Sequence, residues 1–169
     1  MKKSVTYAFI DSQNLNLGVQ SLGWKLDWRK FRQYLGTKYG AARVFLFIGY
    51  KPGNEVLYKF LQSVGYIVIF KPSMELPDKS MKGNIDAELV LHTMIEFSNF
   101  DKAIIVSGDG DFYCLVEYLE QKNKLLRIFA PNQHYSSLLR KYNKYIIRVD
   151  LLRNSLELKK TKISGRSKP

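Results

Sequence analysis

The chain has 169 residues, of which 46% are hydrophobic and 25% charged, a composition typical of one globular domain rather than a disordered chain. Its single cysteine excludes a disulfide framework and a cysteine-rich zinc site. Because no apolar run is long enough to cross a bilayer and no signal-peptide core precedes Asp11, we expect a soluble cytoplasmic protein. Lysine and arginine number 27 against 15 acidic residues, and this net charge of +12 favours a polyanionic partner such as nucleic acid.

Short segments rich in valine, isoleucine and phenylalanine alternate along the chain with longer amphipathic segments. The short segments predict strands buried on both faces, at residues 5–10, 43–49, 66–70, 102–107, 125–130 and 145–149. Between them the pattern predicts helices at residues 28–39, 55–64, 86–97, 112–121 and 136–142. Alternating strands and helices imply right-handed crossovers, so we expect a three-layer α/β/α fold with a mostly parallel central sheet.

The sequence predicts one α/β domain over residues 1–150, followed by a basic tail over residues 151–169. This tail contains six basic residues and one acidic residue, a pattern typical of a solvated extension. Inside the domain, residues 71–85 form one long connection that contains two prolines. Long loops in compact domains are often functional, so this connection is a candidate part of a binding site.

Aspartates stand where the predicted strands end and where the long connection meets its helix. Asp11 ends the first strand, and Asp109 and Asp111 follow the fourth strand in a Gly-Asp-Gly-Asp segment. Asp86 begins the helix after the long connection. Because the carboxyl ends of parallel strands line one crevice, we expect these four side chains to meet there.

Carboxylates that converge in this way need protons or cations to neutralise them. Two ionised carboxylates about 5 Å apart repel by roughly 3 kcal/mol at an effective dielectric constant near 20. Ligands that are all oxygen atoms suit Mg²⁺ or Mn²⁺ better than zinc or copper. Such a cation can orient a phosphodiester, lower the pKa of an attacking water and stabilise the leaving oxygen. A single aspartate after a strand is more often a turn or helix cap, but caps have no reason to gather at one edge.

Other interpretations of the Gly-Asp-Gly-Asp segment fit its spacing less well. A dinucleotide-binding fingerprint would need a third glycine where Tyr113 stands. An EF-hand loop that begins at Asp109 would need a glycine where Cys114 stands, and this cysteine is expected in the apolar core. A haloacid-dehalogenase-like phosphatase would need a second aspartate where Gln13 stands, and it is kept as a minor alternative.

Three segments together resemble the NYN domain, a group of PIN-like nucleases, and most of all its LabA-like bacterial branch. They are residues 9–14 (FIDSQN), 82–86 (KGNID) and 107–112 (SGDGDF), and their order agrees with the family over about residues 4–150. The resemblance implies a PIN-like α/β/α fold, a divalent metal (Mg²⁺ or Mn²⁺) and hydrolysis of RNA. By match to these motifs, the catalytic and metal-binding residues are Asp11, Asp86, Asp109 and Asp111, with Asn14 beside the metal and Ser107 supporting the turn.

The chain departs from the family pattern at His92, where many relatives carry a further aspartate. We expect His92 to be a packed side chain rather than a ligand, and neither His92 nor His134 has a nucleophile partner in the sequence. A non-catalytic RNA-binding or regulatory module of the same fold is therefore the second hypothesis.

Substrate contacts are expected along the same edge of the sheet. Lysines there would contact phosphates, and an aromatic side chain would stack on an unpaired base. The expected residues follow the strand ends or lie in the long connection, and they are Tyr50, Lys51, Lys71, Lys79, Lys82 and Asn132. The sequence thus predicts RNA as the partner, predicts no membrane contact, and leaves homo-oligomer formation open.

Overall fold

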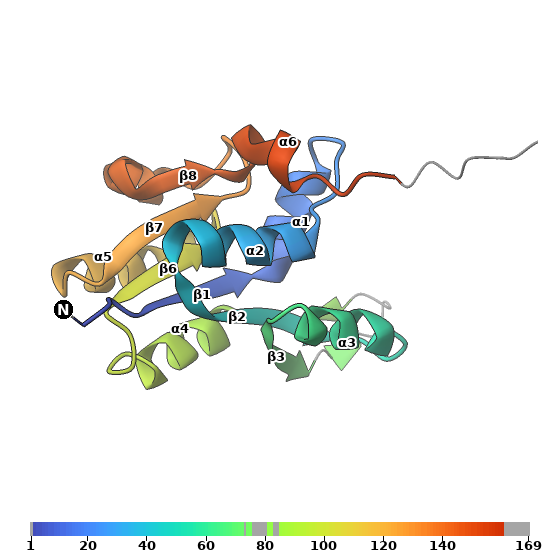
Figure 1. Ribbon diagram of the computed structural model, residues 1–169, viewed down its shortest axis with the longest axis horizontal. Coiled ribbons are helices and arrows are strands. Elements are labelled where there is room, and N and C mark those ends of the chain that lie inside the picture. The colour runs from blue at the N-terminus through green and yellow to red at the C-terminus, as the bar shows by residue number, and fades with distance from the viewer. Residues whose placement is uncertain (1, 73, 76–80, 83–84, 161–169) are drawn as a thin grey trace, which may run out of the picture.

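The computed structural model describes residues 2–72, 74–75, 81–82 and 85–160 (Figure 1). Within these residues, six strands form one sheet in the order β3-β2-β1-β6-β7-β8, and all neighbours pair in parallel. The strands are β1 (Thr6–Asp11), β2 (Ala41–Tyr50), β3 (Ile67–Pro72), β6 (Lys102–Val106), β7 (Leu125–Ala130) and β8 (Ile146–Arg148). Two further strands, β4 (Met74–Glu75) and β5 (Met81–Lys82), pair with each other in the antiparallel sense.

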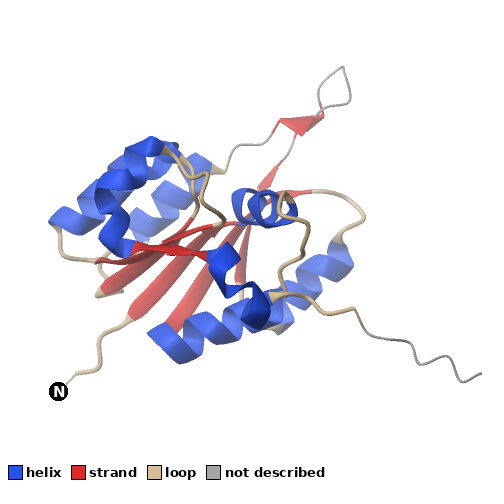
Figure 2. Ribbon diagram, turned by 90° about the horizontal axis from the view of Figure 1, so that it is seen from above, coloured by secondary structure: helices blue, strands red, loops and turns tan. Residues whose placement is uncertain are grey.

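Helices cover both faces of the sheet and give the predicted three layers (Figure 2). Residues of α1, α2, α3 and α6 join the core on one face, and residues of α4 and α5 join the core on the other. The α-helices are α1 (Ser12–Gln20), α2 (Trp28–Tyr39), α3 (Glu55–Ser63), α4 (Asp86–Ile95), α5 (Tyr113–Gln121) and α6 (Arg153–Leu156). The 3₁₀ segments are Gly110–Phe112, Ser137–Tyr145 and Val149–Leu152.

The central strand β1 is apolar from Tyr7 to Ile10 because both of its faces are covered there. Ala8 and Ile10 belong to the core on the α1 face, whereas Tyr7 and Phe9 belong to the core on the α4 face. Successive side chains of a strand point to opposite faces, so a strand between two helix layers needs an apolar residue at every position. This confirms the interpretation of the short apolar segments as strands of a parallel sheet.

The strand order reverses beside β1, and this reversal opens a crevice at one edge of the sheet. From β1 the chain moves outward to β2 and β3, and it later returns to β6, which pairs with the other side of β1. The connections that leave β1 and β6 therefore diverge to opposite sides. In open α/β sheets, ligands bind in the crevice that such a switch point creates outside the carboxyl ends of the strands.

The structure differs from the sequence prediction in several elements. The helix α1 was not predicted, because only Leu15 and Val19 are buried apolar residues in a mainly polar segment. The segment predicted as a helix at residues 136–142 is a 3₁₀ segment instead. The edge strand β3 is only partly buried, since it pairs on one side alone. These differences leave the predicted layer order unchanged.

The prediction that Cys114 lies in the core is wrong, because this side chain is exposed. In α5 the side chains that contact the sheet are Leu115, Val116 and Leu119, and Cys114 stands outside that stripe. No described helix is long and apolar enough to cross a membrane.

The chain stays folded beyond residue 150, where a solvated extension was expected. Leu156 is 1% exposed and packs in the core on the α1 face. Its carbonyl accepts a hydrogen bond from the Asp27 N–H (2.8 Å), and the Leu158 N–H donates to the Lys25 carbonyl (2.8 Å). These contacts keep the segment attached to the domain as far as residue 158, although it carries several basic residues. Residues 161–169 lie outside the described part.

We predict that Leu156→Ala lowers the free energy of unfolding by about 2–4 kcal/mol, the usual cost of truncating a buried leucine. Leu158→Ala is the matched control, because Leu158 is 52% exposed. Its expected effect stays within about 0.5 kcal/mol. Urea denaturation followed by circular dichroism measures both, and equal effects would show that α6 does not belong to the folded core.

Candidate functional site

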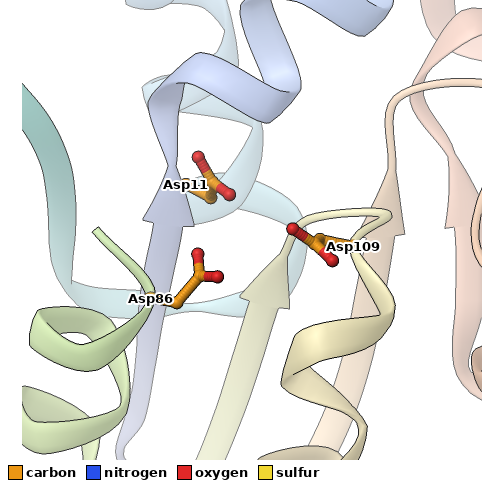
Figure 3. A group of neighbouring side chains, drawn as sticks. All are labelled: Asp11, Asp86 and Asp109. Atoms are coloured by element: carbon orange, nitrogen blue, oxygen red, sulfur yellow. The ribbon is translucent and has the colours of Figure 1, made fainter. Parts of the chain in front are cut away.

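Three aspartates from separate parts of the chain meet at the switch point (Figure 3). Asp11 ends β1, Asp86 begins α4, and Asp109 lies in the turn after β6. One carboxylate oxygen from each lies within 4.8 Å of the other two. Asp11 is buried, while Asp86 and Asp109 are half-buried. This arrangement of oxygen atoms alone can hold a divalent cation.

Hydrogen bonds fix Asp11 between the first turn of α1 and the end of β6. Its Oδ1 accepts from the Asn14 backbone N–H (3.1 Å), and its Oδ2 accepts from the Ser107 hydroxyl (3.4 Å). The Ser107 Oγ also accepts from the Asp109 N–H (3.1 Å). The Asn14 Oδ1 accepts from the Gly108 N–H (2.8 Å). Asn14 and Ser107 therefore tie the turn after β1 to the turn after β6, which keeps two of the three carboxylates at a fixed separation.

The glycines of the Gly-Asp-Gly-Asp segment allow the loop after β7 to approach closely. The Ser136 N–H donates to the Gly108 carbonyl (2.9 Å). A β-carbon at Gly108 would lie 3.2 Å from the Tyr135 β-carbon, and one at Gly110 would collide with the Ser136 hydroxyl. The segment thus needs small residues at these two positions, and its aspartates at the other two serve the site.

Burial in the cluster raises the pKa of Asp11 from 3.8 to about 6. Loss of hydration is the largest cause, and the negative charges of Asp86 and Asp109 raise the pKa further. The hydrogen bonds from Asn14 and Ser107 oppose this shift but do not cancel it. The cluster therefore favours a proton, or a cation in its place, over three unneutralised charges.

A cavity of about 540 Å³ opens onto the three aspartates, and we call it the acidic cavity. Asp111 also lines it, but this residue is exposed and stands outside the group whose oxygens lie within 4.8 Å. The Asp111 N–H donates to Asp109 Oδ1 (2.9 Å). Three further lining residues, Gln13, His134 and Tyr135, were not assigned to the site from the sequence. His134 and Tyr135 follow the end of β7 closely, and this position in the sequence could have identified them as site residues.

Asn132, one of the expected substrate residues, reaches the same cavity as the three aspartates. Asn132 lines the acidic cavity, but its amide donates to the Gly18 carbonyl (2.9 Å) and its Oδ1 accepts from the His134 N–H (2.8 Å). It therefore shapes the loop after β7.

His92 is half-buried with its ring centroid 5.5 Å from that of Phe47, so it is a packed side chain as predicted.

The residues at the ends of β2 and β3 do not line the acidic cavity. The Tyr50 hydroxyl donates to Glu55 (3.3 Å), and its ring packs against Phe70. Lys71 forms an ion pair with Glu88 (3.5 Å). Lys51 lines a neighbouring cavity instead. Lys82 lies in β5 by its backbone, while its side chain and all of Lys79 lie outside the described part of the structure.

The family profile described as the NYN domain matches residues 6–152, most of the chain. The chain belongs to the NYN domain family. It is 26% identical to the low amplitude and bright protein LabA of Synechococcus elongatus over 159 residues, which cover 88% of this chain and 86% of LabA. NYN domains are generally PIN-like nucleases, and a group of converging aspartates fits a nuclease site.

A solved structure shares the fold of this chain. A crystal structure of a protein of unknown function from Vibrio parahaemolyticus superposes on this chain with a TM-score of 0.76. The two chains are 23% identical, and the match covers 94% of this chain and 100% of the other. This similarity shows the fold, and it confirms the predicted α/β/α architecture.

We predict that Asp11→Asn stabilises the metal-free protein at pH 7.5 by up to about 3 kcal/mol, and that the gain falls towards zero at pH 4. A pKa raised from 3.8 to about 6 means that folded Asp11 binds its proton more tightly than unfolded Asp11 does. Wild-type stability therefore decreases as the pH rises through this window, at about 1.4 kcal/mol per pKa unit. Urea denaturation at both pH values in the presence of chelator measures the difference.

Asp27→Asn is the matched control for this prediction. Asp27 caps α2 by accepting from the Lys30 N–H (3.1 Å), as Asp11 caps α1, but it lies beside the Lys30 ammonium rather than beside other carboxylates. Removing its charge should give no gain in stability at pH 7.5. Equal effects of Asp11→Asn at pH 7.5 and pH 4 would contradict the raised pKa of Asp11 in the folded protein.

Proposed function

We propose that this protein is a metal-dependent ribonuclease that hydrolyses RNA phosphodiester bonds. The observation that carries the proposal is the approach of Asp11, Asp86 and Asp109 to within 4.8 Å at the switch point of the sheet. Three carboxylates in one place lower the stability of the fold at neutral pH unless they bind a cation. Their convergence is therefore best explained by a function that uses one.

The residues present fit Mg²⁺ or Mn²⁺, since the available ligand atoms are all carboxylate oxygens. Asp11, Asp86 and Asp109 would hold the ion, and the exposed Asp111 would contact it through water. When bound, such an ion supplies an activated water and stabilises the charge that develops on the phosphate oxygens. The described chain itself supplies a rigid frame, because Asn14 and Ser107 hold Asp11 and the turn after β6 in register.

RNA is the proposed substrate on the basis of charge and of family membership. A net charge of +12 attracts a polyanion over long distances, although the acidic cavity itself repels phosphates without a cation. A cation at the three aspartates would remove this local repulsion and admit a phosphodiester. Gln13, His134 and Tyr135 line the space that the phosphodiester would enter.

A non-catalytic RNA-binding module is the second candidate, and His92 favours it. His92 stands where many NYN relatives carry a further aspartate, so this position offers the site no carboxylate, and its ring packs against Phe47 of β2. In that case the aspartates would regulate or stabilise the protein without cleaving RNA. The cleavage experiment separates the two candidates.

We predict that the wild type cleaves a labelled single-stranded RNA with Mn²⁺ or Mg²⁺ and not with chelator. Asp109→Asn should lower the rate by at least about 100-fold, more than the 10–100-fold typical of residues that only support a metal ligand. Glu117→Gln is the control, because Glu117 lies on α5 in an ion pair with Lys141 and does not line the acidic cavity. A folded wild type that binds RNA without cutting it would favour the second candidate.

We also predict that Mn²⁺ raises the thermal unfolding temperature of the wild type, and that this rise is lost in Asp86→Asn. At 100 times the dissociation constant, a ligand of the folded state adds about 2.7 kcal/mol to its stability. Differential scanning fluorimetry across a Mn²⁺ titration measures the effect without reference to activity. Glu117→Gln should keep the full rise, and an unchanged rise in Asp86→Asn would exclude this residue as a ligand.

A further inference from the structure

A second cavity of about 350 Å³ lies next to the acidic cavity, and we call it the side cavity. It lies between α1, α3 and the end of β2, with Leu17, Trp28 and Leu57 among its lining residues. The two cavities share Gln13, Leu17 and Ile85. A chain that occupies one can therefore continue directly into the other.

The wall between the two cavities is one face of α1. Gln13 and Leu17 stand one helical turn apart on this face, and both line the two cavities. One turn of an α-helix rises about 5.4 Å, so neighbouring groups of one bound strand can lie on either side of it. The acidic cavity would take a phosphodiester, and the side cavity is the adjoining space for the group next to it.

The lining of the side cavity suits a flat ring with a polar edge. Its apolar walls include Trp28, which is half-buried, and Leu57, which is 39% exposed. Its volume is near the lower end of the range of about 300–1,000 Å³ that is typical of small-molecule sites. A cavity with apolar walls and a few polar groups orients one planar ligand well.

Three side-chain amides, those of Gln13, Asn16 and Asn54, supply polar groups. The Asn16 Oδ1 already accepts from the Gln20 side chain (3.4 Å). Asn54 precedes α3 at its N-cap position but makes no side-chain cap hydrogen bond. Gln13 is exposed and lines both cavities. Amides of this kind can donate to and accept from the edge of a base. Lys51 lines the same cavity with an exposed side chain, which adds a positive charge for the backbone of a nucleic acid.

We propose that the side cavity is a nucleobase subsite that takes one unstacked base of single-stranded RNA, whose neighbouring phosphodiester lies in the acidic cavity. This inference rests on the proposed function, because it needs RNA at the acidic cavity. Continuity of the two cavities and the positive charge of Lys51 favour an RNA strand as the occupant. A base inside a duplex cannot enter, so the subsite selects unpaired RNA.

The test is a set of short single-stranded RNAs, each with an abasic residue at a different position. Their binding is measured by fluorescence anisotropy with Ca²⁺ in place of Mg²⁺ or Mn²⁺, so that a cation fills the group of carboxylates, and gel electrophoresis checks that the RNA stays intact. Wild type should bind about tenfold more weakly when one particular position lacks its base, in the range expected for a stacked base. Abasic residues at the remaining positions should have smaller effects.

Two variants of neighbouring residues on α3 locate the effect in the side cavity. Leu57→Trp places a large ring in the cavity and should weaken binding of the intact RNA about tenfold, while removing the preference for a base at the sensitive position. Val56→Trp is the matched control, because Val56 is 83% exposed and does not line the cavity, and it should behave as wild type. Circular dichroism checks that both variants are folded. Asn54→Ala tests the subsite with a smaller change.

The outcomes separate the subsite from the nuclease. Equal binding of all abasic RNAs, or equal binding by Leu57→Trp and Val56→Trp, would overturn the subsite even if wild type cleaves RNA. A position-dependent loss that Leu57→Trp abolishes would establish the subsite even if wild type never cleaves. Failure of wild type to bind any of the RNAs would overturn both proposals.

Discussion

The crowding of Asp11, Asp86 and Asp109 at the switch point is the constraint on which the rest of the site depends. Burial deprives Asp11 of hydration, which is the largest cause of its raised pKa, and ionised carboxylates whose oxygens lie within 4.8 Å add a repulsion of roughly 3 kcal/mol per pair at an effective dielectric constant near 20. The fold offsets part of this cost with hydrogen bonds to Asp11 from the Asn14 N–H and the Ser107 hydroxyl, and yet the pKa of Asp11 remains raised. A cluster that lowers stability in this way is expected where function requires it.

The parallel sheet is what makes such a cluster rigid. Asp11 and the Ser107–Asp109 turn follow neighbouring strands, which are paired along their lengths and covered on both faces. The carboxylates cannot separate without disturbing that core. Asp86 reaches the same place from the first turn of α4, which packs through Leu89 on the face opposite α1. The site is therefore built from three elements that the core holds together.

In the proposed complex with RNA, the two cavities would serve opposite kinds of chemistry. The acidic cavity would take a cation and a phosphodiester, whereas the side cavity would offer apolar walls and amides to a base. The face of α1 that carries Gln13 and Leu17 contributes to both. A net charge of +12 would attract such a polyanion over long distances, and short-range contacts in the cavities would then orient it.

The sequence by itself determined the layer architecture and the approach of the aspartates, because apolar segments at strand spacing fix a parallel sheet and strand ends meet at one edge. It did not reveal that Asp111 stands apart from the other three, that Lys71 pairs with Glu88, or that Leu156 belongs to the core. Nor did it reveal the side cavity. Each of these depends on which way a side chain points and which distant segment it contacts, and only the packing of helices on the sheet decides that.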